Sequence, residues 1–465
     1  MDTKTIKTLT LLASLFVTCA ASTLTNASPP NNSYISYPET LQPYVIQFTT
    51  ANVPPADRQK VADTLAFVCA SFSRQQIIEY CVPQRHATLP DTYFIQLDKL
   101  KWSNYDWNRF VAQVYPYGYY SGDKRYSASD TNRHYYPERS NKTYKADWFI
   151  SYITDANNSS AGYALLYGSE QIPKNRSDFL KFWEVNTKAE HAFGLIESSS
   201  RVSKRNLRWL ENYSRPRGYV WGTKDFLNID PTKSTDPFTY PIPNDSRQKH
   251  DGEEWIVGVP KISSTSGERG ALQVYMLFDG QGKRIDKADG DLVEDHTRYK
   301  GFSQIRTSGS CIQCHTSGLN GPTHNAIKEL ILSGGDIYAS YQGKEALELF
   351  HLSDSAKEIK RANEDYATAV FEITLTSPEL NAKVFKQIVD KYVARVDIQT
   401  AARDLYTTPE NLRLAFAYES NTNKSLSPYI VQLAQDQSIN RETWEAIYLS
   451  AKQYLDKYNA LQNAK

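Results

Sequence analysis

Two apolar runs lie close together in the middle of the chain, Glu254-Trp-Ile-Val-Gly-Val259 and Leu272-Gln-Val-Tyr-Met-Leu-Phe278. Both have the short length and the content of β-branched and aromatic residues that strands favour. Asp279-Gly280 and Gly282, which follow the second run, are typical of turns. We therefore predict a β-rich section over residues 216–300, which leads directly to a loop whose cysteine motif is described below.

The sequence on either side of this section predicts both helices and strands. Upstream, apolar spacing predicts helix over residues 57–81, and alternation predicts a strand over residues 92–98. Residues 28–60 contain two Pro-Pro pairs and few periodic apolar positions, so we expect a tether or surface wrap there.

Downstream of the loop the sequence becomes helical. Ser377-Pro378-Glu379 and Thr408-Pro409-Glu410 each place an N-cap residue before a first-turn proline and an acidic residue, and Asn440 begins a last helix. The expected fold class is α+β. It comprises a mixed helical and strand domain over residues 28–215, the β-rich section, and a mostly helical region over residues 301–465.

Composition excludes some classes of partner. The 465 residues include 53 Lys and Arg against 52 Asp and Glu, which gives a net charge of +1. Such a balance gives no support for nucleic acid or an anionic membrane as the main partner. The hydrophobic fraction of 40% is that of a globular protein and excludes a wholly disordered chain.

The N-terminus has the pattern of a secretory signal peptide over residues 1–27. Lys4 and Lys7 precede an apolar run over residues 9–21, and small polar residues follow. Neither this run nor any later one reaches the ~20 apolar residues of a membrane span, so we expect no transmembrane segment. We predict a periplasmic or secreted protein. Cys19 lies in a loose match to a lipoprotein cleavage site, so lipid anchoring there is an alternative to its removal with the signal peptide.

Cys69 and Cys81 stand twelve residues apart. In an oxidising compartment such a pair is expected to form a disulfide, which would join the end of one helix to the next. Two buried free thiols are the alternative.

The motif that indicates chemistry is Cys311-Ile-Gln-Cys314-His315. C-x-x-C-H is typical of c-type haem attachment. Two thiols three positions apart can reach the two vinyl groups of one haem, and the adjacent imidazole can bind the iron. We therefore predict one covalent haem c, with His315 as proximal ligand. A thioredoxin-like site would need a strand before the motif and a helix after it, and a zinc site would need further ligands; neither pattern is present.

More than one residue is a candidate for the sixth iron ligand. No methionine follows Cys311 in the sequence, so the candidates are Met276, which could equally be a core residue, and His250, which could equally be a surface residue. Weaker candidates are the three histidines His296, His324 and His351.

Several stretches together resemble a family of exported bacterial monohaem c-type proteins with no assigned reaction. The resemblance rests on seven segments, which are Lys145-Ala-Asp-Trp-Phe149, Val202-Ser-Lys-Arg-Asn206, His250-Asp-Gly-Glu-Glu254, Leu272-Gln-Val-Tyr-Met-Leu277, Gly282-Lys-Arg-Ile-Asp286, Cys311–His315 and Val396–Ala402. It departs from the family at Glu253, where a second glycine is usual, and in an insertion over residues 262–269. It implies export and haem attachment, and no activity.

Two main functions are consistent with these features. The first is electron transfer through the haem, with a redox partner protein or a small-molecule oxidant or reductant. The second is a peroxidase-like haem enzyme or small-ligand sensor with an open sixth position, in which His250, Asp251 or Glu254 would act as distal acid or base. A protein that uses haem only to hold its fold is a third.

Overall fold

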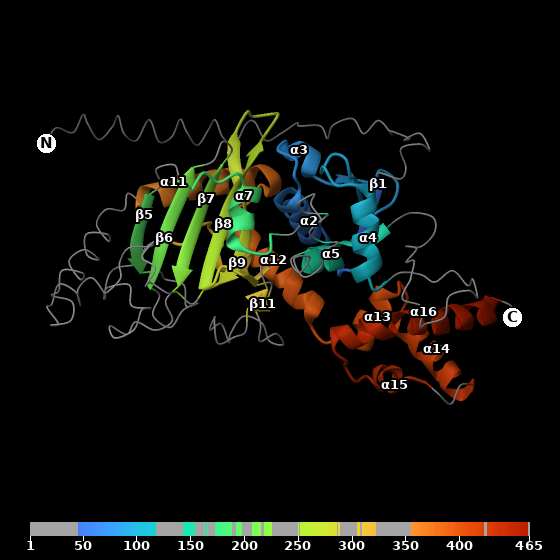
Figure 1. Cartoon of the computed structure of the whole chain (residues 1–465). Coiled ribbons are helices and arrows are strands. Elements are labelled where there is room, and N and C mark those ends of the chain that lie inside the picture. The colour runs from blue at the N-terminus through green and yellow to red at the C-terminus, as the bar shows by residue number, and fades with distance from the viewer. Residues whose placement is uncertain are drawn as a thin grey trace, which may run out of the picture.

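The computed structural model describes residues 45–117, 143–153, 162, 165, 173–187, 192–197, 207–214, 218–225, 250, 252–285, 287–288, 305–306, 309–321, 355–422 and 426–463. The expected signal peptide and Cys19 lie outside these residues. The described part contains many helices and two larger sheets, which confirms the predicted α+β class (Figure 1). No helix in it is long and apolar enough to span a bilayer.

The larger sheet has six strands in the order β10-β9-β8-β7-β6-β5. Its strands are β5 (Ala192–Glu197), β6 (Leu207–Ser214), β7 (Tyr219–Asp225), β8 (Gly252–Ile262), β9 (Arg269–Asp279) and β10 (Arg284–Ile285). The two apolar runs of the sequence thus form the central hairpin, β8 and β9. Because β6 pairs with β7, the domain boundary expected after residue 215 was wrong and divides one sheet. No signal in the sequence marked β5 and β6 as strands.

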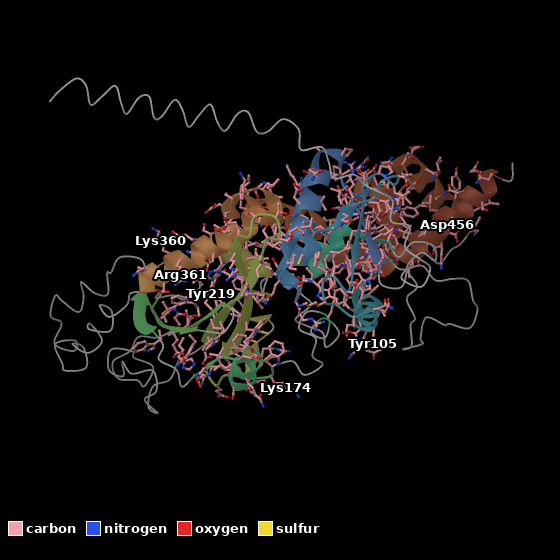
Figure 2. The ribbon with its side chains drawn as sticks, turned by 90° about the horizontal axis from the view of Figure 1, so that it is seen from above. Tyr105, Lys174, Tyr219, Lys360, Arg361 and Asp456 are labelled. Carbon is pink, nitrogen blue, oxygen red and sulfur yellow. The ribbon has the colours of Figure 1, made fainter. Side chains whose placement is uncertain are left out.

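Helices cover both faces of this sheet. Figure 1 shows α7 (Arg176–Phe182) in front of the strands and α11 (Ser355–Thr374) behind them. On the α7 side, the ring of Phe179 lies 5.9 Å from Trp255 and 5.5 Å from Phe278. On the α11 side, the hydroxyl of Tyr219 donates to the carbonyl of Ala362 at 3.4 Å, and Figure 2 shows Tyr219 beside this helix. The sheet is therefore buried on both sides, as its apolar strands require.

The smaller sheet has four strands in the order β2-β3-β1-β4. They are β1 (Val45–Thr49), β2 (Gln84–Arg85), β3 (Thr92–Gln96) and β4 (Thr143–Lys145). β1 lies inside this sheet, antiparallel to β3 and parallel to β4. The expected surface wrap over residues 28–60 was therefore wrong from Val45 onward, since Ile46 and Phe48 are fully buried.

The helix expected over residues 57–81 is divided. A 3-10 turn, η2 (Pro55–Asp57), leads into α2 (Arg58–Phe72), and α3 (Ile78–Cys81) follows after a break. At the break, the ammonium group of Lys261 from β8 binds the carbonyls of Ser73 and Gln75 at 3.2 and 2.6 Å. These carbonyls lie beyond the end of α2, so a distant strand supplies the donor for them.

Two further helices lie in the same part of the chain as the four-stranded sheet. They are α4 (Asn104–Val114) and α5 (Ala146–Ile153). Trp107 on α4 packs edge-on against Phe48 of β1 at 6.0 Å, and α5 packs on α2. One hydrophobic core runs from these elements through the six-stranded sheet to the C-terminal helices.

The C-terminal region is helical, as predicted. After α11 come α12 (Pro378–Val393), α13 (Ile398–Asp404), α14 (Pro409–Thr422), α15 (Pro428–Ala434) and α16 (Arg441–Asn463). The predicted caps are present: side-chain oxygens of Ser377, Thr408 and Asn440 accept from backbone N–H groups three residues ahead at 3.3, 3.1 and 2.7 Å. Short strands β11 (Lys287–Ala288) and β12 (Ile305–Arg306) pair just before the cysteine motif.

Cys69 on α2 and Cys81 on α3 are both buried thiols in this structure. Burial raises the pKa of Cys69, and the charge of a Cys81 thiolate would raise it further, so the two groups are close. Their disulfide stays a prediction.

We expect Cys69 and Cys81 to be joined in protein isolated from an oxidising compartment. Its intact mass should then rise by two hydrogens on reduction, and a non-reduced digest should contain one peptide pair that holds both cysteines. If alkylation of the unfolded, unreduced protein labels both residues, the free-thiol alternative is correct.

Lys261 gives a prediction about pH. Burial lowers the pKa of this fully buried ammonium group from 10.5 to about 8. The folded protein therefore binds this proton more weakly than the unfolded chain, so the contribution of Lys261 to stability should rise from about pH 8 to about pH 10.5, by about 3 kcal/mol in all. The measurement is urea unfolding of the wild type and of Lys261→Met across this range. The difference in unfolding free energy between them should grow in favour of the wild type; parallel profiles would contradict the assignment.

Candidate functional site

The cysteine motif forms one short helix, α8 (Gly309–Cys314). Because Cys311 and Cys314 stand three residues apart on one helical turn, they share a face of this helix. The backbone N–H of His315 donates to the carbonyl of Cys311 at 2.7 Å, so the imidazole follows the turn directly. Cys311 is 5% exposed and His315 is 6% exposed, whereas Cys314 is only partly covered. The three predicted residues are thus brought together.

The loop after α8 fixes one nitrogen of His315. Its Nδ1 lies 3.0 Å from the carbonyl oxygen of Gly318. Gly318 has a φ of +101°, and a Cβ there would lie 2.4 Å from Oδ1 of Asn363. Asn363 on α11 in turn binds both backbone groups of Leu319, at 2.6 and 2.9 Å. Only glycine fits between the loop and α11, and this close packing orients the ring.

The other nitrogen of His315 faces the sheet. Its Nε2 lies 3.2 Å from Oε1 of Glu254 on β8. The second oxygen of Glu254 accepts from Arg208 on β6 at 3.1 Å, and Arg208 pairs with Asp225 on β7 at 2.8 Å. Burial raises the pKa of Glu254, but the charges of His315 and Arg208 outweigh this effect and lower the pKa to about 2. Three neighbouring strands thus hold an ionised carboxylate against the imidazole.

An aromatic ring completes this side of the site. Tyr275 on β9 lies 5.5 Å from the His315 ring, centroid to centroid. The cavity beside His315, bounded by described residues of three strands, the loop and α11, is about 30 Å³. This volume suits a single water molecule.

The two candidate sixth ligands lie elsewhere. Neighbouring residues of a strand point to opposite faces, so Glu253 and Glu254 face opposite sides of the sheet. Met276 pairs directly with Trp255 on the α7 side, and it is 1% exposed. The side chain of Met276 therefore does not contact His315. The side chain of His250, described next, does not contact it either.

His250 binds Glu253, not His315. Its Nε2 lies 2.6 Å from Oε1 of Glu253, and the same oxygen accepts from Arg176 of α7 at 2.5 Å. Oε2 of Glu253 accepts from the indole N–H of Trp255 at 2.9 Å. Burial raises the pKa of Glu253, but its hydrogen bond to His250 and the charge of Arg176 outweigh this and lower it. Glu253 stands where the family that this sequence resembles has a glycine. Both oxygens of its carboxylate are bound by neighbouring side chains.

The remaining candidates are Asp251, His296, His324 and His351, and all of them lie outside the described residues. Of the two distal acid or base candidates that the structure describes, His250 and Glu254, only Glu254 contacts His315. Sequence reasoning missed Arg208 and Asn363, because no local pattern links them to a motif about a hundred or about fifty residues away.

Comparison of this chain with protein-family models, with curated proteins and with solved structures gave no match.

The Glu254 contacts predict a large cost for losing its charge. Glu254→Gln removes one of the two counter-charges of the buried Arg208 and the carboxylate that faces His315, which should lower the unfolding free energy by about 1–3 kcal/mol. Glu364→Gln is the control, since Glu364 makes an exposed pair with Lys360 at 3.8 Å and its loss should cost below about 0.5 kcal/mol. Urea unfolding measures both. Equal losses for the two variants would contradict the role given to Glu254.

Proposed function

We propose that this chain is a periplasmic monohaem c-type cytochrome-like protein that transfers electrons through one covalent haem c. Cys311 and Cys314 would form the thioether bonds, and His315 would be the proximal ligand. The observation that carries the proposal is the arrangement of these three residues on one helical turn, with Nδ1 of His315 directed to the Gly318 carbonyl. The export signal and the family resemblance of the sequence agree with it.

The donor groups of the site fit this attachment, but the cavity of about 30 Å³ beside His315 is far smaller than a haem, so neighbouring segments would have to open to admit it. A histidine that binds a metal usually gives its other ring N–H to a carbonyl or carboxylate, which fixes its orientation, and the Gly318 carbonyl meets that need. Glu254 occupies the side of Nε2, so this contact would have to be given up if Nε2 held the iron. Haem c, when bound, supplies one-electron chemistry at its iron. Arg208 and Glu254 are charges beside that nitrogen and would adjust the reduction potential.

An enzyme or sensor with an open sixth position is the second candidate, and one observation favours it. Among the described residues, the single methionine and His250 lie on the α7 side of the sheet, whereas His315 lies on the other. Neither of these two candidates therefore closes the sixth position there. The acceptor would then be a small molecule rather than a redox protein.

The attachment itself can be tested directly. The full chain, produced in a bacterial host with haem-ligation machinery, should retain porphyrin absorbance after denaturation and acid extraction. Cys311→Ala/Cys314→Ala should lose it, because no thioether can form, whereas Cys69→Ala should keep it. Wild-type protein that shows no porphyrin absorbance, or that binds zinc at the motif, would refute the proposal.

The optical spectrum of the ferrous protein, with and without carbon monoxide, separates the two candidates. Rapid binding of carbon monoxide indicates an open sixth position, and no binding indicates a closed carrier. Because Met276 and His250 lie across the sheet from His315, Met276→Leu and His250→Ala should leave the spectrum unchanged. A shift in either variant would identify that residue as a ligand and would contradict the placement described above.

A further inference from the structure

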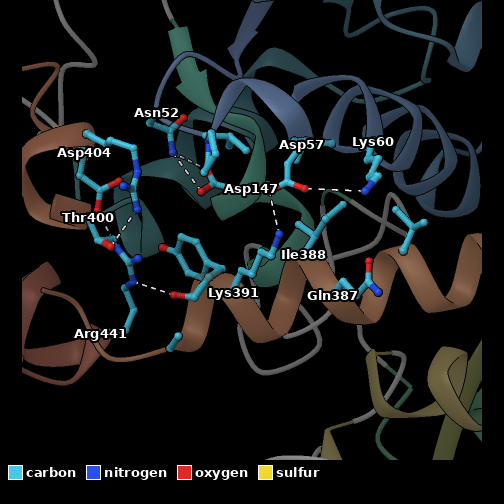
Figure 3. Close-up of a pocket in the computed structure, with 17 residues that line it drawn as sticks. Asn52, Asp57, Lys60, Asp147, Gln387, Ile388, Lys391, Thr400, Asp404 and Arg441 are labelled. Carbon is cyan, nitrogen blue, oxygen red and sulfur yellow. Dashed lines mark hydrogen bonds and ion pairs between the residues drawn. The ribbon is translucent and has the colours of Figure 1, made fainter.

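A second cavity is lined by residues that do not belong to the cysteine motif. It has a volume of about 330 Å³ and lies between the segment that enters α2, the start of α5, helix α12 and the first residue of α16 (Figure 3). This volume is within the range of about 300–1,000 Å³ that is usual for small-molecule sites. None of its lining residues belongs to α8 or to the six-stranded sheet.

One side of the cavity holds a group of three buried charges, two cations and one carboxylate. Asp404 at the end of α13 pairs with Arg441 of α16 at 2.6 Å and with Lys145 of β4 at 3.1 Å. The indole N–H of Trp444 donates to it at 2.9 Å. Burial raises the pKa of Asp404, but the two cations outweigh this and lower it. Two cations against one carboxylate leave this wall with one excess positive charge, and the charges of Lys145 and Arg441 also act on the neighbouring Asp147.

Asp147 on α5 is different. Both of its carboxylate oxygens accept from the side-chain amide of Asn52, at 3.0 and 2.9 Å, and one also accepts from the backbone N–H of Trp148. No cation among the described residues lies within ion-pair distance of it. Burial raises the pKa of Asp147, and the charge of Asp404 raises it further. The hydrogen bond from Asn52 and the charges of Lys145 and Arg441 lower it by less, so the negative charge of Asp147 is only partly compensated.

The side-chain oxygen of Asn52 is a buried acceptor without a hydrogen bond from the described residues. Asn52 is 4% exposed, and no donor in the described part of the chain reaches its buried Oδ1. A buried acceptor without a donor is costly and uncommon in proteins. Asn52 and Asp147 both line the cavity (Figure 3), so a ligand that donates hydrogen bonds and carries positive charge would satisfy both.

Other lining residues carry the opposite excess charge. Lys60 and Lys391 share one carboxylate, that of Asp57, at 3.8 and 2.7 Å. Both lysine side chains are more than half exposed, and the exposed Arg403 also lines the cavity. The two lysines and Arg403 carry more positive charge than Asp57 offsets, so they attract a negatively charged group.

The walls between these polar groups are apolar, and they are formed by Val53, Val61, Val384, Ile388 and Tyr392. An occupant therefore needs an ammonium group, a carboxylate and an apolar body. We propose that this cavity binds an aliphatic amino acid, with its ammonium group on Asp147 and Asn52 and its carboxylate toward Lys60 and Lys391. This assignment does not depend on the haem, and either proposal can fail alone.

Isothermal titration of the full chain with three matched probes tests the assignment. L-Leucine carries both charged groups, its methyl ester keeps only the ammonium group, and 4-methylpentanoate keeps only the carboxylate. We expect binding of leucine, and at least about tenfold weaker binding of each analogue, because each loses a charged contact. No binding of leucine at millimolar concentration, or equal binding of either analogue, would overturn the proposal.

Variants locate the binding. Asp147→Asn should weaken leucine binding by about tenfold or more, and Lys391→Gln by about threefold to tenfold. Lys386→Gln is the control on the same helix, since Lys386 pairs with Asp390 and does not line the cavity. If Asp147→Asn does not fold, Lys391→Gln still decides, because its side chain is exposed. Leucine binding that is unchanged in Lys391→Gln, or weakened equally in Lys386→Gln, would place the ligand elsewhere.

Discussion

The alternation of side chains along β8 is the constraint on which the arrangement of the molecule depends. Glu253 and Glu254 are neighbours in sequence, yet a strand directs them to opposite faces of the six-stranded sheet. Glu253 holds His250, Trp255 and α7 on one face, whereas Glu254 holds Arg208 and His315 on the other. One peptide unit thus separates two buried carboxylate networks, and it determines which residues can meet the cysteine motif.

Much of the fold could be predicted from short-range patterns. The strands at the centre of the larger sheet follow from two runs of β-branched and aromatic residues, and the caps at Ser377, Thr408 and Asn440 follow from local hydrogen bonding. The grouping of Cys311, Cys314 and His315 is also local, because all three lie within five consecutive residues. These features need no knowledge of the rest of the chain.

The features that the sequence did not reveal depend on contacts between distant segments. β1 is short, and its partners lie up to about a hundred residues away, so Val45–Thr49 could not be distinguished from a surface segment. At the break after α2, the backbone carbonyl of Ser73 is bound by Lys261 of a distant strand. The hydrogen bonds from the Asn52 amide to the Asp147 carboxylate join residues that are 95 positions apart. The sixth-ligand candidates were chosen by residue type, and only the pairing of β8 with β9 places Met276 on the face away from His315.

The burial of Cys311 has a consequence for the order of maturation. With 5% of its surface exposed, this thiol is inaccessible to a ligation enzyme once α8 has packed against β12 and α12. If a cofactor is joined at this position, it would have to be attached before the surrounding segments close over it. Biogenesis would then proceed from covalent loading to final folding, and the apoprotein that folds first would be a dead end.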